Sequence, residues 1–77
     1  MTKKLSELKR GEKGMIVNVN LNGLTRRRLL DLGFIPGTVI SVVFESPLGD
    51  PVAYLVRDTI IALRKDESEK IEVELIN

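Results

Sequence analysis

The stretch RRRLLDLGFIPGTVI, residues 26–40, shows how the chain around it is organised. Leu29, Leu30 and Leu32 fall on one arc when successive residues advance by about 100°, which predicts a short helix with one apolar face. Gly33 is the expected end of this helix, because glycine adopts the left-handed conformation at low cost. The stretch therefore predicts a helix that stops abruptly.

The residues after the helix have the pattern of a cap followed by a turn. With Gly33 as the first residue beyond the cap, Phe34 is expected to contact Leu29 one turn back, as in a Schellman motif. Pro36 prevents the helix from continuing, and Pro36-Gly37 leads into a β-branched run. The predicted order is helix, cap, turn and strand.

The three arginines at the start of the stretch are not needed for that fold. Helical spacing places Arg27 and Arg28 towards solvent, and places Arg26 inside the apolar arc, with its stem along the edge of the core. Arg26, Arg27 and Arg28 are therefore the candidate partner-binding residues. The alternative is an ordinary solvated helix face.

Strand patterns lie on both sides of the predicted helix. Residues 13–21 alternate, which places one set of apolar side chains against the core: Met15, Val17, Val19 and Leu21. Residues 39–44 are apolar at nearly every position, Phe44 included, which predicts a central strand buried on both faces. The helix therefore connects two strands.

Three further strands are expected at 52–56, 59–64 and 71–75, the last with Ile71, Val73 and Leu75 facing inward. The turns between strands are marked by Pro47, Gly49 and Pro51, by the hairpin pair Arg57-Asp58, and by polar residues 65–70. Residues 5–8 form at most one helical turn. Five short strands with one helix after the first predict a small, mainly β barrel whose closure removes open sheet edges.

The composition excludes several functional classes. The 77 residues fit one domain and contain neither histidine nor cysteine. Nucleophilic catalysis then lacks its usual base, and a transition-metal site lacks its usual ligands. We expect no enzyme, no catalytic residues, no cofactor and no dedicated metal site.

The charge balance and the hydropathy pattern limit the kinds of partner that are expected. The net charge is +1 and there are three aromatic residues, so a nucleic-acid partner is not expected. Eight of the twelve basic residues lie in the first 28 positions and five acids follow position 65, which predicts a basic face and an acidic face. There is no signal peptide pattern and no membrane-spanning apolar run, so the protein is expected to be soluble and not membrane-inserted.

Five segments occur in an order that resembles the FeoA family: LSELKRGEKGMIVNV, RRRLLDLGFIPGT, PLGDPVAYLV, IALRKDE and IEV. The similarity extends from about Leu5 to Val73, and Asp58 departs from the glycine that the family often has in its hairpin. The resemblance implies a five-stranded SH3-like barrel, with a helix inserted after the first strand, that occupies residues 1–77 as a single domain.

The resemblance also implies a function. FeoA proteins are small cytoplasmic components of bacterial ferrous iron uptake, so the expected partner is the cytosolic portion of the FeoB permease. If the arginines are only a solvated face, the alternative docking face is around Leu48 and Tyr54. A similar module ends DtxR-type metal-dependent repressors, which leaves a regulatory role as the alternative; no helix-turn-helix pattern precedes it within these residues. The oligomeric state stays open.

Overall fold

The computed structural model describes residues 2–76 and is mainly β, as predicted. Its elements are β1 (Thr2–Lys4), the 3-10 turn η1 (Leu5–Glu7), β2 (Lys13–Val19), α1 (Gly23–Asp31), β3 (Val39–Glu45), β4 (Val52–Val56), β5 (Thr59–Leu63), α2 (Lys65–Ser68) and β6 (Ile71–Ile76). The five predicted strands and the helix after the first of them are confirmed. β1 is a sixth strand, and three polar residues gave no pattern by which to predict it.

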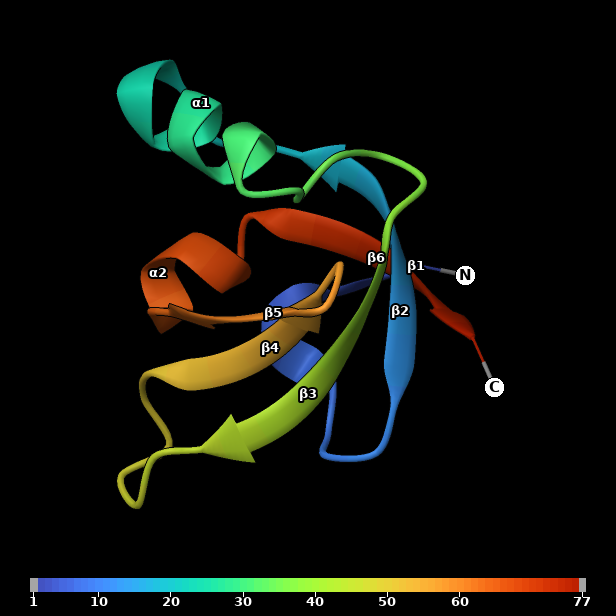
Figure 1. The fold of residues 1–77 in the computed structure, drawn as a ribbon, viewed down its shortest axis with the longest axis vertical. Helices are drawn as coiled ribbons and strands as arrows, with labels where there is room; N and C mark the ends of the chain where they lie inside the picture. The colour runs from blue at the N-terminus through green and yellow to red at the C-terminus, as the bar shows by residue number, and fades with distance from the viewer. Residues whose placement is uncertain (1, 77) are drawn as a thin grey trace.

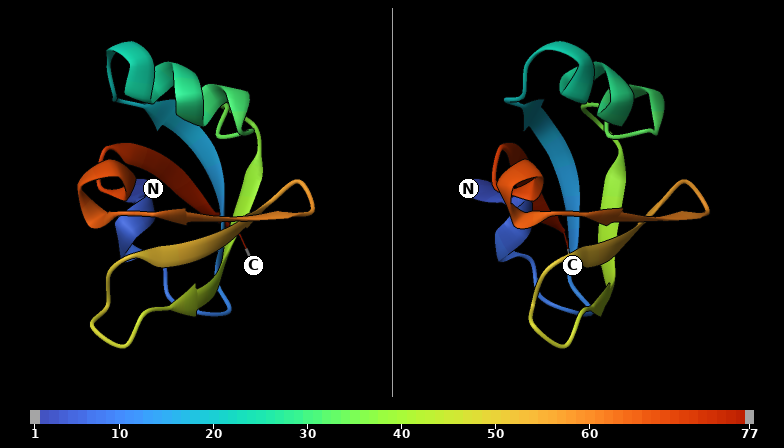
Figure 2. Two further views of the ribbon diagram at one scale, coloured as in Figure 1. Left: turned by 60° about the vertical axis from the view of Figure 1, so that its left-hand side comes forward. Right: turned by 90° about the vertical axis from the view of Figure 1, so that its left-hand side faces the viewer.

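The strands form one antiparallel sheet in the order β1-β6-β2-β3-β4-β5, which curves round a single core (Figures 1 and 2). Within residues 2–76 no ladder joins β1 to β5, so the predicted closure of the barrel is wrong. The segments next to the two edges meet instead, because α2 follows β5, η1 follows β1, and α2 contacts η1. The two edges are thus bridged by packing and not by hydrogen bonds.

The core lies on the inner face of the sheet, where the curved strands face one another. Leu5 of η1, Leu29 of α1 and Phe34 are completely buried there. The other buried apolar residues are Leu8, Ile16, Val19, Leu21, Ile40, Val42, Tyr54, Val56, Leu63, Ile71 and Val73. The cluster draws side chains from every strand but β1.

The end of α1 confirms the predicted Schellman motif. The N–H of Phe34 donates to the carbonyl of Leu29 at 2.9 Å, and the N–H of Gly33 donates to that of Leu30 at 3.0 Å. Gly33 has a φ of +110°. The apolar face of α1 is narrower than the sequence predicted, since Leu29 is buried, Leu30 is half-buried and Leu32 is 38% exposed.

The turns also match their predictions. After Pro36, the N–H of Gly37 donates to the carbonyl of Ile16 at 2.8 Å and ties the turn to β2. Arg57 and Asp58 both have positive φ, 48° and 67°, which is the geometry of a type I′ hairpin between β4 and β5. Within the predicted polar turn at residues 65–70, Lys65–Ser68 form a single helical turn.

A β-bulge in β2 changes which side chains face the core. The register with β6 shifts between Ile16 and Asn18. Ile16 is consequently buried and Val17 is 37% exposed, so the predicted inward position of Val17 is wrong, as is that of Met15, which is half-buried. Val19 and Leu21, beyond the bulge, are buried as predicted. The bulge reverses the alternation within the strand.

β3 is buried on one face and not on two. Ile40 and Val42 lie in the core, whereas Val39, Val43 and Phe44 are 45%, 37% and 54% exposed. The prediction of a doubly buried strand is therefore wrong. Leu75 of β6, predicted to face inward, is also 38% exposed near the end of its strand.

The two oppositely charged parts of the chain lie next to each other and not on opposite faces. β1 pairs with β6 so that Lys4 is opposite Glu72 and Thr2 is opposite Glu74. The predicted separation into a basic face and an acidic face is therefore wrong for these segments, because sheet pairing brings them together. No helix in residues 2–76 has both the length and the apolar character needed to cross a membrane.

Candidate partner-binding surface

The three arginines predicted as the binding site occupy consecutive positions of α1, and all three are exposed. They do not have the same surroundings. Nη2 of Arg28 lies 2.6 Å from Oε2 of Glu67 on α2, and the two side chains are 52% and 19% exposed. Arg28 therefore joins the two helices, and the inference that it has no part in the fold is wrong.

Glu67 makes this contact while it also caps its own helix. Its Oε1 atom accepts a hydrogen bond from the N–H of Arg64 at 3.3 Å, the reciprocal bond of a capping box at the start of α2. One carboxylate thus orders the first turn of α2 and holds it against α1. Sequence reasoning missed the pair, since its members are 39 residues apart.

Arg26 and Arg27 remain available for a partner. They line a shallow hollow of about 410 Å³ together with Gly23, Leu30 and Asp31. Within residues 2–76 the one ion pair is that of Arg28, so neither guanidinium is neutralised by a contact. Arg26 is exposed beside the half-buried Leu30, at the edge of the core where its stem was expected. The two arginines present positive charge on the outside of α1.

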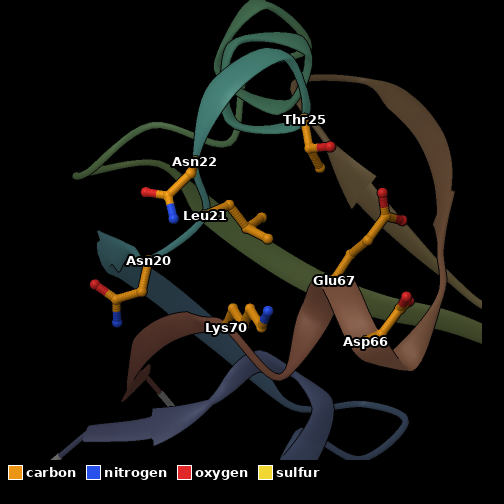
Figure 3. Close-up of a pocket in the computed structure, with 7 residues that line it drawn as sticks. All are labelled: Asn20, Leu21, Asn22, Thr25, Asp66, Glu67 and Lys70. Carbon is orange, nitrogen blue, oxygen red and sulfur yellow. The ribbon is translucent and has the colours of Figure 1, made fainter.

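A groove of about 370 Å³ lies between the start of α1 and α2 (Figure 3). Its lining comes from two distant parts of the chain: Asn20, Leu21, Asn22, Thr25, Asp66, Glu67 and Lys70. Figure 3 shows the Glu67 carboxylate extending towards Thr25, with Leu21 at the centre of the opening. Sequence analysis did not identify this groove, because only folding brings residues 20–25 beside residues 66–70.

The groove offers hydrogen bonds and charge of both signs. Its amides, hydroxyl, carboxylates and ammonium group suit contacts with a polar protein surface. Among the described residues there is no group of three or more acidic, histidine or cysteine side chains spaced to hold a metal ion. Together with the adjoining arginines, the groove forms a polar surface along α1.

Leu48, half of the predicted alternative site, projects from a well-ordered turn. It is 96% exposed. Around it, Ser46 Oγ donates to the Pro51 carbonyl at 2.7 Å, and the N–H of Gly49 donates to the Ser46 carbonyl at 2.7 Å. Pro47 is exposed beside Leu48 in the same turn. The turn presents one apolar side chain to solvent.

A further contact ties this turn to the rest of the fold. The Asp50 carboxylate accepts a hydrogen bond from the N–H of Lys65, at the start of α2, at 2.9 Å. The first turn of a helix has unpaired N–H groups, and Asp50 satisfies one of them from a different part of the chain. The turn that carries Leu48 is thus held at both ends.

Tyr54, the other half of the alternative site, is not available to a partner. It is 1% exposed, so its assignment to a docking face is wrong. Burial raises the pKa of the Tyr54 phenol, a hydrogen bond with Ser68 lowers it, and the nearby charges of Glu45 and Asp50 raise it further. Tyr54 is a core residue whose hydroxyl contacts buried Ser68.

Comparison with known proteins places the chain in a family. Residues 3–75 match the family model of the FeoA domain. The chain is 46% identical over 74 residues to an Fe(2+) transport protein A/Fe(2+) transporter FeoB fusion protein of Porphyromonas gingivalis, covering 96% of this chain and 9% of the fusion protein. It is 36% identical to the putative Fe(2+) transport protein A of Campylobacter jejuni, covering 94% of this chain and 97% of that protein.

Solved structures agree on the fold. Iron(II) transport protein A of Clostridium thermocellum superposes with a TM-score of 0.92 at 38% identity, over 96% of this chain and 46% of that chain. The FeoA of Stenotrophomonas maltophilia, a prokaryotic SH3 domain protein complexed with zinc, superposes with a TM-score of 0.81 at 33% identity. The superposition covers 96% of this chain and 89% of that chain.

One repressor module shares the same architecture. A manganese-dependent transcriptional repressor superposes with a TM-score of 0.87 at 12% identity, over 97% of this chain and 41% of the repressor, which is a likeness of fold alone. The FeoA relatives, by contrast, are 46% and 36% identical to this chain over nearly its whole length. The protein is a member of the FeoA family, with an SH3-like fold.

Proposed function

We propose that this protein is a cytoplasmic accessory of bacterial ferrous iron uptake that docks on the cytosolic portion of a FeoB-type permease. In this role it modulates the permease's nucleotide cycle or its assembly. The observation that carries the proposal is the fusion relative, in which a domain 46% identical to this chain is named as part of one protein with the transporter FeoB. A domain joined to its partner in one chain works beside it.

The surface supports docking through Arg26 and Arg27. Both are exposed, neither is neutralised within the described part of the chain, and the cap at Gly33 and the Arg28–Glu67 contact fix the orientation of their helix. Surface charge of this kind directs encounter and orientation with a partner of opposite sign. We therefore assign the contact on the permease to an acidic surface, with Leu48 as the alternative point of attachment.

Calorimetric titration of the protein into the isolated cytosolic portion of the permease tests the proposal. Saturable binding supports it, and the absence of heat at concentrations up to about 1 mM overturns it. The double variant Arg26→Glu/Arg27→Glu should bind more weakly if the helix face is the contact.

A matched control separates the site from net charge. Lys9→Glu/Arg10→Glu makes the same change in total charge on the exposed loop between η1 and β2, at the opposite end of the molecule from α1 (Figure 1). This control should keep wild-type affinity. Equal loss in both double variants would mean that overall charge, and not the α1 face, governs binding. A loss confined to Leu48→Ala would move the contact to the 46–51 turn.

A further inference from the structure

The outer face of β3, β4 and β5 is apolar and uncovered. The exposed fractions of its large side chains are 45% for Val39, 37% for Val43, 54% for Phe44, 38% for Leu55 and 61% for Ile60. The remaining outward positions on these strands are small or weakly polar: Ser41, Ala53 and Ala62. We call these eight residues the outer sheet face. It contains no charged side chain.

A β-bulge is the reason that Phe44 lies on this face. The register between β3 and β4 pairs Val42 with Tyr54 and then Phe44 with Ala53, skipping Val43. Val42 and Tyr54 point into the core, so regular alternation would have turned Phe44 inward as well. The bulge directs it outward, where the small side chain of Ala53 leaves the phenyl ring uncovered.

Exposing these side chains has a cost that the fold does not recover. Burial of large apolar side chains is the main favourable contribution to folding, and both Phe44 and Ile60 are more than half exposed, at 54% and 61%. Five partly exposed side chains leave on the order of 400 Å² of apolar surface, within the size range of functional patches on small proteins. An interface of standard size buries about 800 Å² per partner, a little over half of it apolar. The outer sheet face supplies that apolar share.

Large and small side chains alternate on this face in a way that makes it complementary to itself. One row across the strands is Phe44, Ala53, Ala62, and the next outward row is Ser41, Leu55, Ile60. A two-fold axis parallel to β4 would place Phe44 over the second copy's Ala62. The same axis would place Ile60 over the second copy's Ser41 and would bring the two Leu55 side chains together.

We propose that the outer sheet face is the contact between two copies of this chain, packed sheet against sheet about a two-fold axis over β4. Two sheets packed in this way lie about 10 Å apart, which the interdigitation of large over small side chains permits. The absence of charge on the face avoids repulsion between identical surfaces, and the net charge of +1 opposes association only weakly. This inference does not depend on the proposed role beside the permease.

Sedimentation equilibrium of the isolated chain tests the contact without any permease. The wild-type mass should rise from monomer towards dimer as the concentration is raised to about 1 mM. Phe44→Glu and Ile60→Glu should each remain monomeric over that range, because they place like charges inside the contact. Leu48→Glu, at a residue that is 96% exposed but off this face, should dimerise like the wild type. A monomeric wild type, or dimerisation of both β-strand variants, overturns the proposal.

Cysteine cross-linking gives a second test that does not depend on mutating the face to charge. The chain has no cysteine, so Leu55→Cys introduces a single thiol at the proposed axis. Mild oxidation should convert most of Leu55→Cys to a covalent dimer and leave Leu48→Cys largely monomeric. Equal yields from both variants, or none from Leu55→Cys, contradict the two-fold arrangement. If Phe44→Glu instead weakens only binding to the permease, the face belongs to that partner and the self-contact is refuted.

Discussion

Arg28 on α1 and Glu67 on α2 place their side-chain nitrogen and oxygen atoms 2.6 Å apart, beside the groove that Glu67 helps to line. The same carboxylate caps the first turn of α2. The contact therefore fixes the position of a helix whose neighbouring residues, Arg26 and Arg27, are the proposed docking residues. It turns one of three adjacent arginines from a surface charge into part of the fold.

The Arg28–Glu67 pair should contribute modestly to stability. In a double-mutant cycle of Arg28→Gln and Glu67→Gln, we expect a coupling of about 0.2–1 kcal/mol, since the arginine is half exposed. The coupling should fall at high salt, because exposed charges are screened. Urea unfolding at two ionic strengths measures it. A coupling of zero at low salt would show that the helices are held together without the pair.

Gly33→Ala should destabilise the protein more than Gly49→Ala. Both glycines have positive φ, +110° and +85°, where a side chain costs about 1–2 kcal/mol. At Gly33 a Cβ would also lie 3.0 Å from Cγ1 of Val56 and 3.2 Å from Cδ of Arg57, whereas at Gly49 it would meet nothing within 4 Å. The difference between the two variants in unfolding free energy measures the crowding. Equal losses would mean that the loop after α1 moves aside at little cost.

Tyr54 should titrate above the ordinary tyrosine value. It is the sole tyrosine and the chain has no tryptophan, so its ultraviolet phenolate absorbance can be followed directly. Burial raises its pKa, and we expect a midpoint above 10.0 in the folded protein and near 10.0 in denaturant. A folded midpoint at or below the denatured one would place the phenol in solvent.

This pKa difference also predicts how stability depends on pH. The unfolded chain releases the phenolic proton first, so the contribution of Tyr54 is fully present below pH 10.0 and is lost as pH rises through the folded pKa. Tyr54→Phe removes this group and should show a shallower loss of stability in that alkaline range. Identical alkaline slopes in the two proteins would contradict the burial of the hydroxyl.

Metal titration should give no strong stoichiometric site. With no histidine or cysteine, the available ligands are oxygen atoms, which bind Fe²⁺ and Zn²⁺ more weakly than nitrogen and sulfur ligands do. We expect no saturable site tighter than about micromolar for either ion. One tight site would direct attention to the acidic residues that follow position 65.

Short sequence patterns predicted the parts of the fold that depend on contacts between residues close together in the chain. The leucine arc, Gly33 and Pro36 predicted the helix and its cap, because those bonds form between residues at most five apart. The hairpin at Arg57-Asp58 depends in the same way on adjacent residues. The Leu29–Phe34 relationship followed from the cap geometry alone.

Features set by pairing between distant strands were not predictable from the pattern. Bulges in β2 and β3 expose Val17 and Phe44. No residue type in the sequence indicates where a strand will accommodate the extra residue of a bulge. The Arg28–Glu67 contact and the groove beside it depend on how α1 and α2 are brought together by the fold. The arginines of the candidate site were therefore predicted, but their contacts and the groove were not, and Tyr54, predicted as part of the alternative docking face, is buried.

The proposed docking is tested most directly by a titration of the wild-type protein into the cytosolic portion of the permease at low and high ionic strength. Docking through Arg26 and Arg27 predicts saturable binding that weakens as salt is raised, and a smaller salt dependence for Arg26→Glu/Arg27→Glu than for Lys9→Glu/Arg10→Glu. The absence of binding at low salt would contradict the proposed function. Binding that Arg26→Glu/Arg27→Glu leaves unchanged in both affinity and salt dependence would contradict the assignment to α1.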